Sequence, residues 1–140
     1  MDFAPLAALQ AKDDWAATGL ILADAARRLE GAGAQAILIC ANTMHINAPE
    51  VGAAVSVPLI HIADATAAAL LAKGVSRPLL LATRFTMEKD FYRDRLERLG
   101  LSVVTPGARD RERLHAIIYD ELCQGVILVA QRVVVLGTIE

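Results

Sequence analysis

Apolar residues at helical spacing define the first element that the chain predicts. Trp15, Leu22, Ala26 and Leu29 recur at steps of seven, four and three residues, so they share one face of a helix. Two aspartates, suited to capping, precede the run at 13–14, and Gly31 and Gly33 follow it. The pattern predicts an amphipathic helix between these signals.

Later segments are apolar without alternation, as in strands of a parallel sheet that are buried on both faces. Such runs occupy 36–40, 57–62, 78–82, 101–105, 126–130 and 133–136. Helical patterns separate most of them: a short helix after Pro49, then 65–73 with Asp64 as its cap and Gly74 at its end, 87–99 and 110–123. The alternation predicts an α/β fold of three layers around a mainly parallel sheet. We expect two parts, at 1–65 and 66–140.

Composition narrows the class of partner. The 140 residues carry 14 basic and 16 acidic side chains, a net charge of -2, and no basic stripe suits a nucleic acid. Mean hydropathy is +0.42, but polar residues interrupt every apolar run before it could span a membrane. No secretory signal is evident at the start, so we expect a cytoplasmic protein. Two cysteines make neither a disulfide framework nor a metal site.

Candidate chemistry gathers where the predicted strands end, because ligands of such sheets lie beyond the carboxyl ends of the strands. Cys40 ends the first strand, and Asn42 and Thr43 follow it with donors for a thiolate or a carboxylate. Core packing is an alternative for Cys40 and is favoured by its local surroundings alone. His45 invites a cysteine/histidine hydrolase hypothesis, although such a histidine more often bonds to a neighbouring carbonyl or faces solvent. His61 and Asp64 at another strand end could line the cleft, but packing within its strand is expected for His61 and capping for Asp64.

Several ordered motifs resemble one family. The segment ILICANTMH, then VPLIHIADAT, LLLATRFTMEKDFYRDRL and HAIIYDELCQG are similar in the same order to the broad-specificity amino-acid racemase branch of the aspartate/glutamate racemase superfamily. The resemblance implies an incomplete version of a two-domain, pseudo-symmetric fold, and a small free amino acid such as aspartate or glutamate as substrate. It implies no cofactor, pyridoxal phosphate included, and a homodimer.

The resemblance also implies roles for particular residues. Cys40 would be one of the two cysteines that exchange the α-proton, and Asn42 and Thr43 would hold the substrate carboxylate and ammonium. Thr83 and Thr86 in the ATRFTM turn would do the same from a facing half-site. Both threonines also suit ordinary duties as turn formers or helix caps. Arg84 either attracts an anionic substrate or is a solvated surface charge.

Two departures from the family pattern qualify this reading. The chain starts at MDFAPL, past the strand and glycine-rich turn with which complete members begin. The second cysteine of the family belongs between Gly137 and Thr138, where this chain has none. Cys123 lies on a predicted helix and is expected to pack in a core or an interface. We therefore expect impaired catalysis, since losing one of two groups that act together costs orders of magnitude.

Two other functions stay open. A non-catalytic α/β module for binding or dimerisation would account for the absent second cysteine. A decarboxylase or isomerase relative would need only one cysteine.

Overall fold

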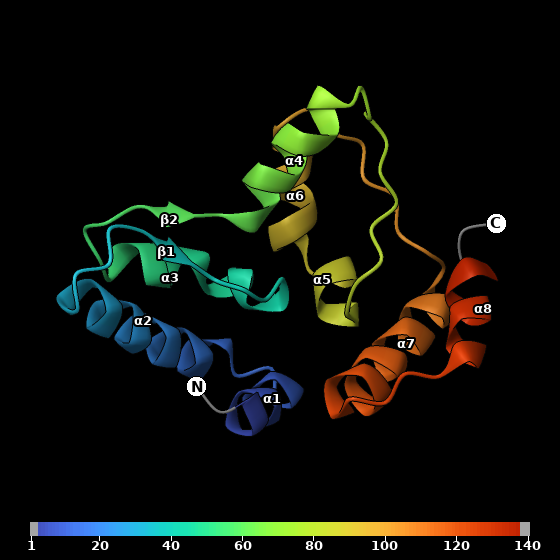
Figure 1. The fold of residues 1–140 in the computed structure, drawn as a ribbon, viewed down its shortest axis with the longest axis horizontal. Coiled ribbons are helices and arrows are strands. Elements are labelled where there is room, and N and C mark those ends of the chain that lie inside the picture. The colour runs from blue at the N-terminus through green and yellow to red at the C-terminus, as the bar shows by residue number, and fades with distance from the viewer. Residues whose placement is uncertain (1–2, 138–140) are drawn as a thin grey trace. The chain divides into compact units, whose positions relative to one another are not determined.

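The computed structural model describes residues 3–137, which form two compact units. Unit 1 ends at Ala65 and unit 2 begins at Thr66. Helices dominate both (Figure 1). The predicted α/β class is confirmed in a helix-rich form with a small parallel sheet. No helix in the described part of the chain combines the length and apolar character needed to cross a membrane.

Unit 1 contains the elements predicted for residues up to 65, in the predicted order, and also the helix α1, which was not predicted. Its elements are α1 (Phe3–Ala11), α2 (Trp15–Gly31), β1 (Ile37–Leu38), the 3-10 helix η1 (Thr43–Asn47), α3 (Ala48–Ala53), β2 (Leu59–Ile60) and the start of α4 (Ile62–Ala72). The helix predicted from Trp15 onward is confirmed as α2. Asp14 caps it by accepting a hydrogen bond from the Ala17 N–H at 3.0 Å, and Gly33 beyond its end has φ +94°, where L-residues are strained.

The sheet of unit 1 buries one face. β1 and β2 run parallel, with Ile37 opposite Leu59 and Leu38 opposite Ile60. Ile37 is 4% exposed and joins Ala26 and Val51 in the core, whereas Leu38 on the other face is 62% exposed. The expectation of a strand buried on both faces is therefore wrong for unit 1, because successive side chains point to opposite faces and, in the described residues, the Ile37 face packs against the core while Leu38 is exposed.

A buried polar network joins α2 to η1. The Asn47 amide donates to the Trp15 carbonyl at 2.8 Å, and the Thr18 hydroxyl lies 2.9 Å from the Asn47 amide oxygen. Thr18 and Asn47 are 0% and 3% exposed. A Cβ on Gly19 would lie 2.9 Å from the Asn47 amide nitrogen, so the close approach of the two helices requires glycine there.

Unit 2 holds the rest of α4 and, within the described residues, six further helical segments. They are α5 (Arg84–Glu88), α6 (Asp90–Arg98), α7 (Ala108–Ala116), continued by the π turn η2 (Ile117–Glu121) and the 3-10 turn η3 (Leu122–Gln124), and α8 (Val129–Gly137). The predicted strands 78–82 and 101–105 are reduced to one parallel bridge, Leu79 with Val104. Ala82, Met87 and Leu114 form a core cluster.

Three predictions fail in unit 2 or at its border. The helix expected over 87–99 begins earlier, at Arg84, and is broken at Lys89, which is extended with ψ 142°. The runs 126–130 and 133–136 are not strands, because α8 takes up most of this segment. A helix satisfies its own backbone, whereas a strand needs a neighbour, and among residues 3–137 no strand pairs with this segment. Asp64 lies inside the first turn of α4 rather than at its cap.

Candidate active site

The turn that follows β1 presents Cys40 to solvent. Cys40 and Asn42 are both exposed, and Thr43 is buried at 7% exposure. Core packing, the alternative reading of Cys40, is thereby excluded. Asn42 stands at the start of η1, and its side chain makes no capping hydrogen bond within the described chain. The Asn42 amide is therefore not used as a cap of η1.

His45 supports this turn from the protein interior. It is 1% exposed. Its Nδ1 lies 2.9 Å from the Ala41 carbonyl oxygen, and its Nε2 accepts a hydrogen bond from the Ile62 N–H at 3.2 Å. Both nitrogens thus face the backbone. Of the two commoner roles, the bond to a neighbouring carbonyl is observed and exposure to solvent is not. A role for His45 as the base of a cysteine hydrolase is not supported.

His61 performs the capping duty that the sequence suggested for Asp64. It precedes α4, and its Nδ1 accepts a hydrogen bond from the Ala63 N–H at 3.1 Å. The His61 ring is 5% exposed and its centroid lies 4.4 Å from that of His45. The ends of β1 and β2 therefore meet at two packed imidazoles.

The second predicted half-site lies in unit 2, at the start of α5. Thr83 caps this helix: its Oγ1 accepts from the Thr86 N–H at 3.3 Å and lies 3.2 Å from the Thr86 Oγ1. Thr86 is fully buried, whereas Thr83 is half-buried. The capping role considered for these threonines thus falls to Thr83. The pair keeps two hydroxyl groups together at the end of the segment 78–82.

Side chains of α7 and of η2, which continues it, hold this second turn in place, and the sequence analysis missed them. The Arg84 N–H donates to His115 Nδ1 at 3.4 Å, and the Arg84 guanidinium pairs with Glu112 at 3.4 Å. The Phe85 ring meets the rings of His115 and Tyr119 edge-on, at centroid distances of 5.3 and 6.5 Å. The signal was present in HAIIYDELCQG, since spacing of four puts His115 and Tyr119 on one helix face.

Burial and charge shift the pKa of two groups in this cluster. Burial of the His115 ring lowers the pKa of its imidazole below the ordinary value, and the nearby Arg84 cation lowers it further, against opposing carboxylates. Neutral His115 can accept from Arg84. Burial also raises the pKa of Tyr119, which therefore keeps its proton.

The predicted site residues thus fall into two sets. Cys40, Asn42 and Thr43 share one turn of unit 1, whereas Thr83 and Thr86 share one turn of unit 2. Cys123 lies in η3 and is exposed, so packing in a core is wrong, and packing in an interface stays a prediction. The stretch proposed to match the second cysteine turn continues into 138–140, outside the described residues.

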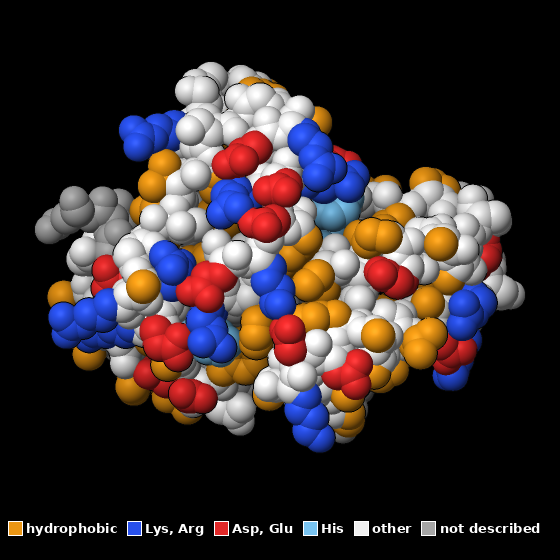
Figure 2. Space-filling model, turned by 180° about the vertical axis from the view of Figure 1, so that it is seen from behind, with side chains coloured by type: hydrophobic (Ala, Val, Ile, Leu, Met, Phe, Trp, Pro, Cys, Tyr) orange, Lys and Arg blue, Asp and Glu red, His pale blue; other side chains and the backbone are white. Residues whose placement is uncertain are grey.

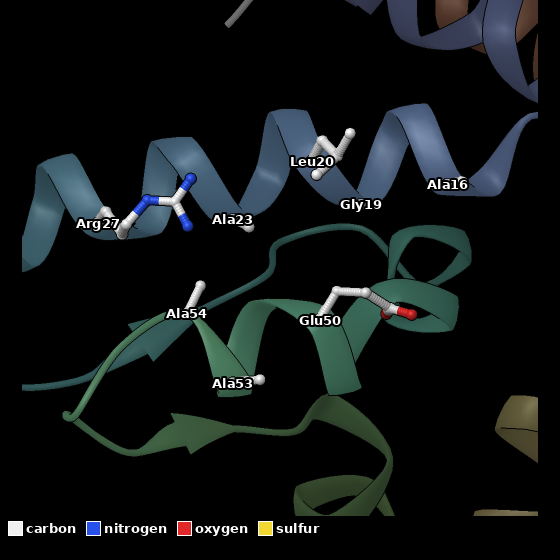
Figure 3. A pocket seen from close by; sticks show the side chains of 8 residues that line it. All are labelled: Ala16, Gly19, Leu20, Ala23, Arg27, Glu50, Ala53 and Ala54. Atoms are coloured by element: carbon white, nitrogen blue, oxygen red, sulfur yellow. The ribbon is translucent and has the colours of Figure 1, made fainter.

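Other surface features lie apart from these turns. A groove between α2 and α3 is lined mostly by small side chains, with Arg27 and Glu50 beside them (Figure 3), and none of the predicted site residues lines it. Acidic and basic side chains are intermixed on the face drawn in Figure 2. Within residues 3–137, no group of histidine, cysteine and carboxylate side chains is arranged to hold a metal ion.

Parallel strands that end in polar turns, one of them with an exposed thiol, are typical of an α/β protein that handles a small molecule. The chain belongs to the Asp/Glu/Hydantoin racemase family, whose model matches residues 1–138.

Two solved structures are similar to it. One, described as a "putative Asp/Glu Racemase" from Yersinia pestis, is 45% identical with a TM-score of 0.86, over 99% of this chain and 60% of that one. The other, an aspartate racemase homologue from Pyrococcus horikoshii OT3, is 42% identical with a TM-score of 0.71, over 84% of this chain and 52% of that one. The chain thus spans between half and two thirds of the length of these relatives.

Proposed function

We propose that this chain is a racemase-like protein that removes and returns the α-proton of a small amino acid such as aspartate or glutamate, without a cofactor. The observation that carries the proposal is the exposed Cys40 thiol in the turn after a parallel strand, in a chain of the racemase family. Asn42 and Thr43 in unit 1, and Thr83 and Thr86 in unit 2, are the proposed ligands of the carboxylate and ammonium. The two units are then two partial half-domains of the racemase fold.

The chemical step needs one thiolate and a stabilised carboxylate. The Cys40 thiolate takes the α-proton, so the Cα–H bond breaks, an S–H bond forms, and the electron pair stays on the substrate. Donors at the carboxylate stabilise the charge that develops there. When the proton returns to the same face of Cα, the configuration is kept. Inversion requires a second proton donor on the opposite face.

The proposed activity therefore transfers a proton on one face of Cα only, and in this sense the site is one-sided. Between Gly137 and Thr138, where the family resemblance places the second cysteine, this chain has none. We infer that the chain exchanges the α-proton with solvent faster than it inverts the substrate.

The test is deuterium incorporation at Cα of aspartate and glutamate in heavy water, followed by NMR. We expect incorporation with the unmodified chain and a loss of about 1000-fold or more in Cys40→Ser. Cys123→Ser is the matched control, because it also removes an exposed thiol, and it should keep the parent rate. Equal rates in Cys40→Ser and the parent would refute the proposal.

A binding or dimerisation module is the second candidate, and one observation favours it. Leu38 and Ile60 are neighbours on the open face of the small sheet and are 62% and 48% exposed, and apolar area of this kind suits association. No exchange with any amino acid, together with a dimer in analytical ultracentrifugation, would favour this function. A homodimer and a cytoplasmic location also belong to the racemase proposal, as implied by the resemblance and the composition.

A further inference from the structure

His45 is a buried histidine that the proposed reaction does not use. It lies five residues beyond Cys40, at 1% exposure, with both ring nitrogens directed at backbone groups. A buried polar side chain loses the hydration of its ring, so two backbone hydrogen bonds are needed to offset that cost. The two backbone groups that the ring binds therefore indicate the role of His45.

The two contacts fix the protonation state of the ring. The Ile62 N–H can only donate, so Nε2 must offer its lone pair. Nδ1 then carries the proton and donates it to the Ala41 carbonyl, 2.9 Å away. A neutral ring with this tautomer satisfies both contacts, and a doubly protonated ring would set an N–H against the Ile62 N–H.

These contacts join the carboxyl ends of both strands through one side chain. Ala41 follows Cys40 directly in the turn after β1, and Ile62 is the first residue of α4, after β2. His61 closes the arrangement from the other side, with its ring centroid 4.4 Å from that of His45 and its Nδ1 bonded to the Ala63 N–H. The peptide unit between Ala41 and Asn42, one residue beyond Cys40, is therefore held by an imidazole that also binds the backbone after β2.

We propose that His45 is a positioning residue for Cys40: its Nδ1–H bond to Ala41 holds the turn so that the sulfur meets the α-proton. The inference rests on the proposed function of Cys40. The two contacts of the ring have different roles. The contact with Ala41 sets the rate of proton transfer, and the contact with Ile62 fixes the backbone that follows β2.

Three substitutions of His45 remove one contact, the other, or both. His45→Asn keeps a donor where Nδ1 stands and loses the acceptor for Ile62. His45→Gln keeps an acceptor near Nε2 and loses the donor to Ala41. His45→Phe keeps a ring of similar volume and loses both. His61→Phe is the control, since it also removes a buried imidazole but not the bond to Ala41.

Two measurements are made on each variant of the 140-residue chain: turnover number and KM for α-proton exchange, and the exchange rate of the Ile62 amide proton. We expect the turnover number to fall about tenfold or more in the His45→Gln and His45→Phe variants, with KM little changed. In the His45→Asn and His61→Phe variants, the turnover number should stay within about threefold of that of the parent. Ile62 amide exchange should quicken in the Asn and Phe variants only. This pattern also rules out a merely structural role, which would follow loss of either bond. An unchanged turnover number in folded His45→Phe, or equal losses in the Asn and Gln variants, would overturn the inference.

A substrate-free measurement separates this inference from the proposed function. If the unmodified chain exchanges no α-proton, the proposed function fails, and alkylation by iodoacetamide decides the role of His45. Peptide mapping gives the ratio of Cys40 to Cys123 modification, with Cys123 as the reference within the same chain. We expect this ratio to change at least about threefold in the Gln and Phe variants and to stay near the parent value in the Asn variant. A constant ratio in all variants would overturn the inference.

Discussion

The turn of Cys40 in unit 1 and the turn of Thr83 in unit 2 are fastened in different ways. His45 reaches the first from the interior, through two bonds to the backbone at 1% exposure. The second is fastened by side chains of α7 that are partly solvated, among them the Arg84–Glu112 pair and His115. Buried neutral hydrogen bonds respond little to salt, whereas exposed ion pairs are screened. The hydrogen bonds that hold the Cys40 turn therefore depend less on salt concentration than the contacts that hold the Thr83 turn.

Among the substitutions that test the two turns, Asn47→Ala is expected to have the largest effect on the free energy of unfolding. Asn47 is the last residue of η1, which follows the Cys40 turn. The substitution removes two hydrogen bonds in a buried site, from the Asn47 amide to the Trp15 carbonyl and from the Thr18 hydroxyl to the Asn47 amide oxygen, while the Thr18 hydroxyl keeps its bond to the Trp15 carbonyl at 2.8 Å. We expect a loss of about 2–3 kcal/mol in the free energy of unfolding. Urea unfolding followed by fluorescence reports on unit 1, because Trp15 is the single tryptophan. Asn42→Ala, on an exposed residue, should stay within about 0.5 kcal/mol, and a similar loss there would contradict a buried network.

Thr83→Val tests the cap of the second turn. The valine keeps the branched shape and removes the oxygen that accepts from the Thr86 N–H. We expect a cost of about 1 kcal/mol and recovery in Thr83→Ser, which restores the hydroxyl. Urea unfolding by near-UV circular dichroism follows unit 2, which contains both tyrosines. Equal stability of the Val and Ser variants would show that the cap contributes nothing.

The sequence predicted the first turn better than the second. Asp14, the helical spacing from Trp15 and the run 36–40 are local signals, and unit 1 follows them. The strand pattern of 126–136 was misleading, since apolar runs of this length also suit a helix when no partner strand is at hand. The helix α1 carries no amphipathic period and was not predicted. In the candidate site, the position of Cys40 at the end of the first strand could be predicted from the sequence. The contacts of His45 with Ile62 and of His115 with Arg84 depend on tertiary packing, which no local pattern encodes.

Acid should weaken unit 2 through His115. Burial lowers the pKa of this imidazole in the folded chain, so the unfolded chain binds more protons in the interval between the lowered value and about 6.5. Stability is therefore lost as the pH falls below about 6.5, and the loss is modest because the ring is partly solvated. His115→Asn, which keeps an acceptor for Arg84, should show a weaker pH dependence of the urea midpoint between about pH 7 and pH 5. An identical pH dependence in parent and variant would argue against this.

The smallest effect is expected at the ion pair between Glu88 and Arg111, which links α5 to α7 at 2.9 Å. Both side chains are partly exposed, at 40% and 23%, so Glu88→Gln should cost about 0.5 kcal/mol or less. The difference between parent and variant should shrink in about 1 M salt. A difference that persists at high salt would place this pair in a less solvated setting than its exposure indicates.

The most direct test of a one-sided proton-transfer site compares exchange with inversion. Each enantiomer of aspartate and glutamate is incubated with the chain in heavy water, deuterium at Cα is measured by NMR, and configuration by chiral chromatography. The account predicts that deuterium enters one enantiomer of a substrate with its configuration kept, and that Cys40→Ser abolishes this. Inversion as fast as deuteration, or exchange that does not depend on Cys40, would contradict it.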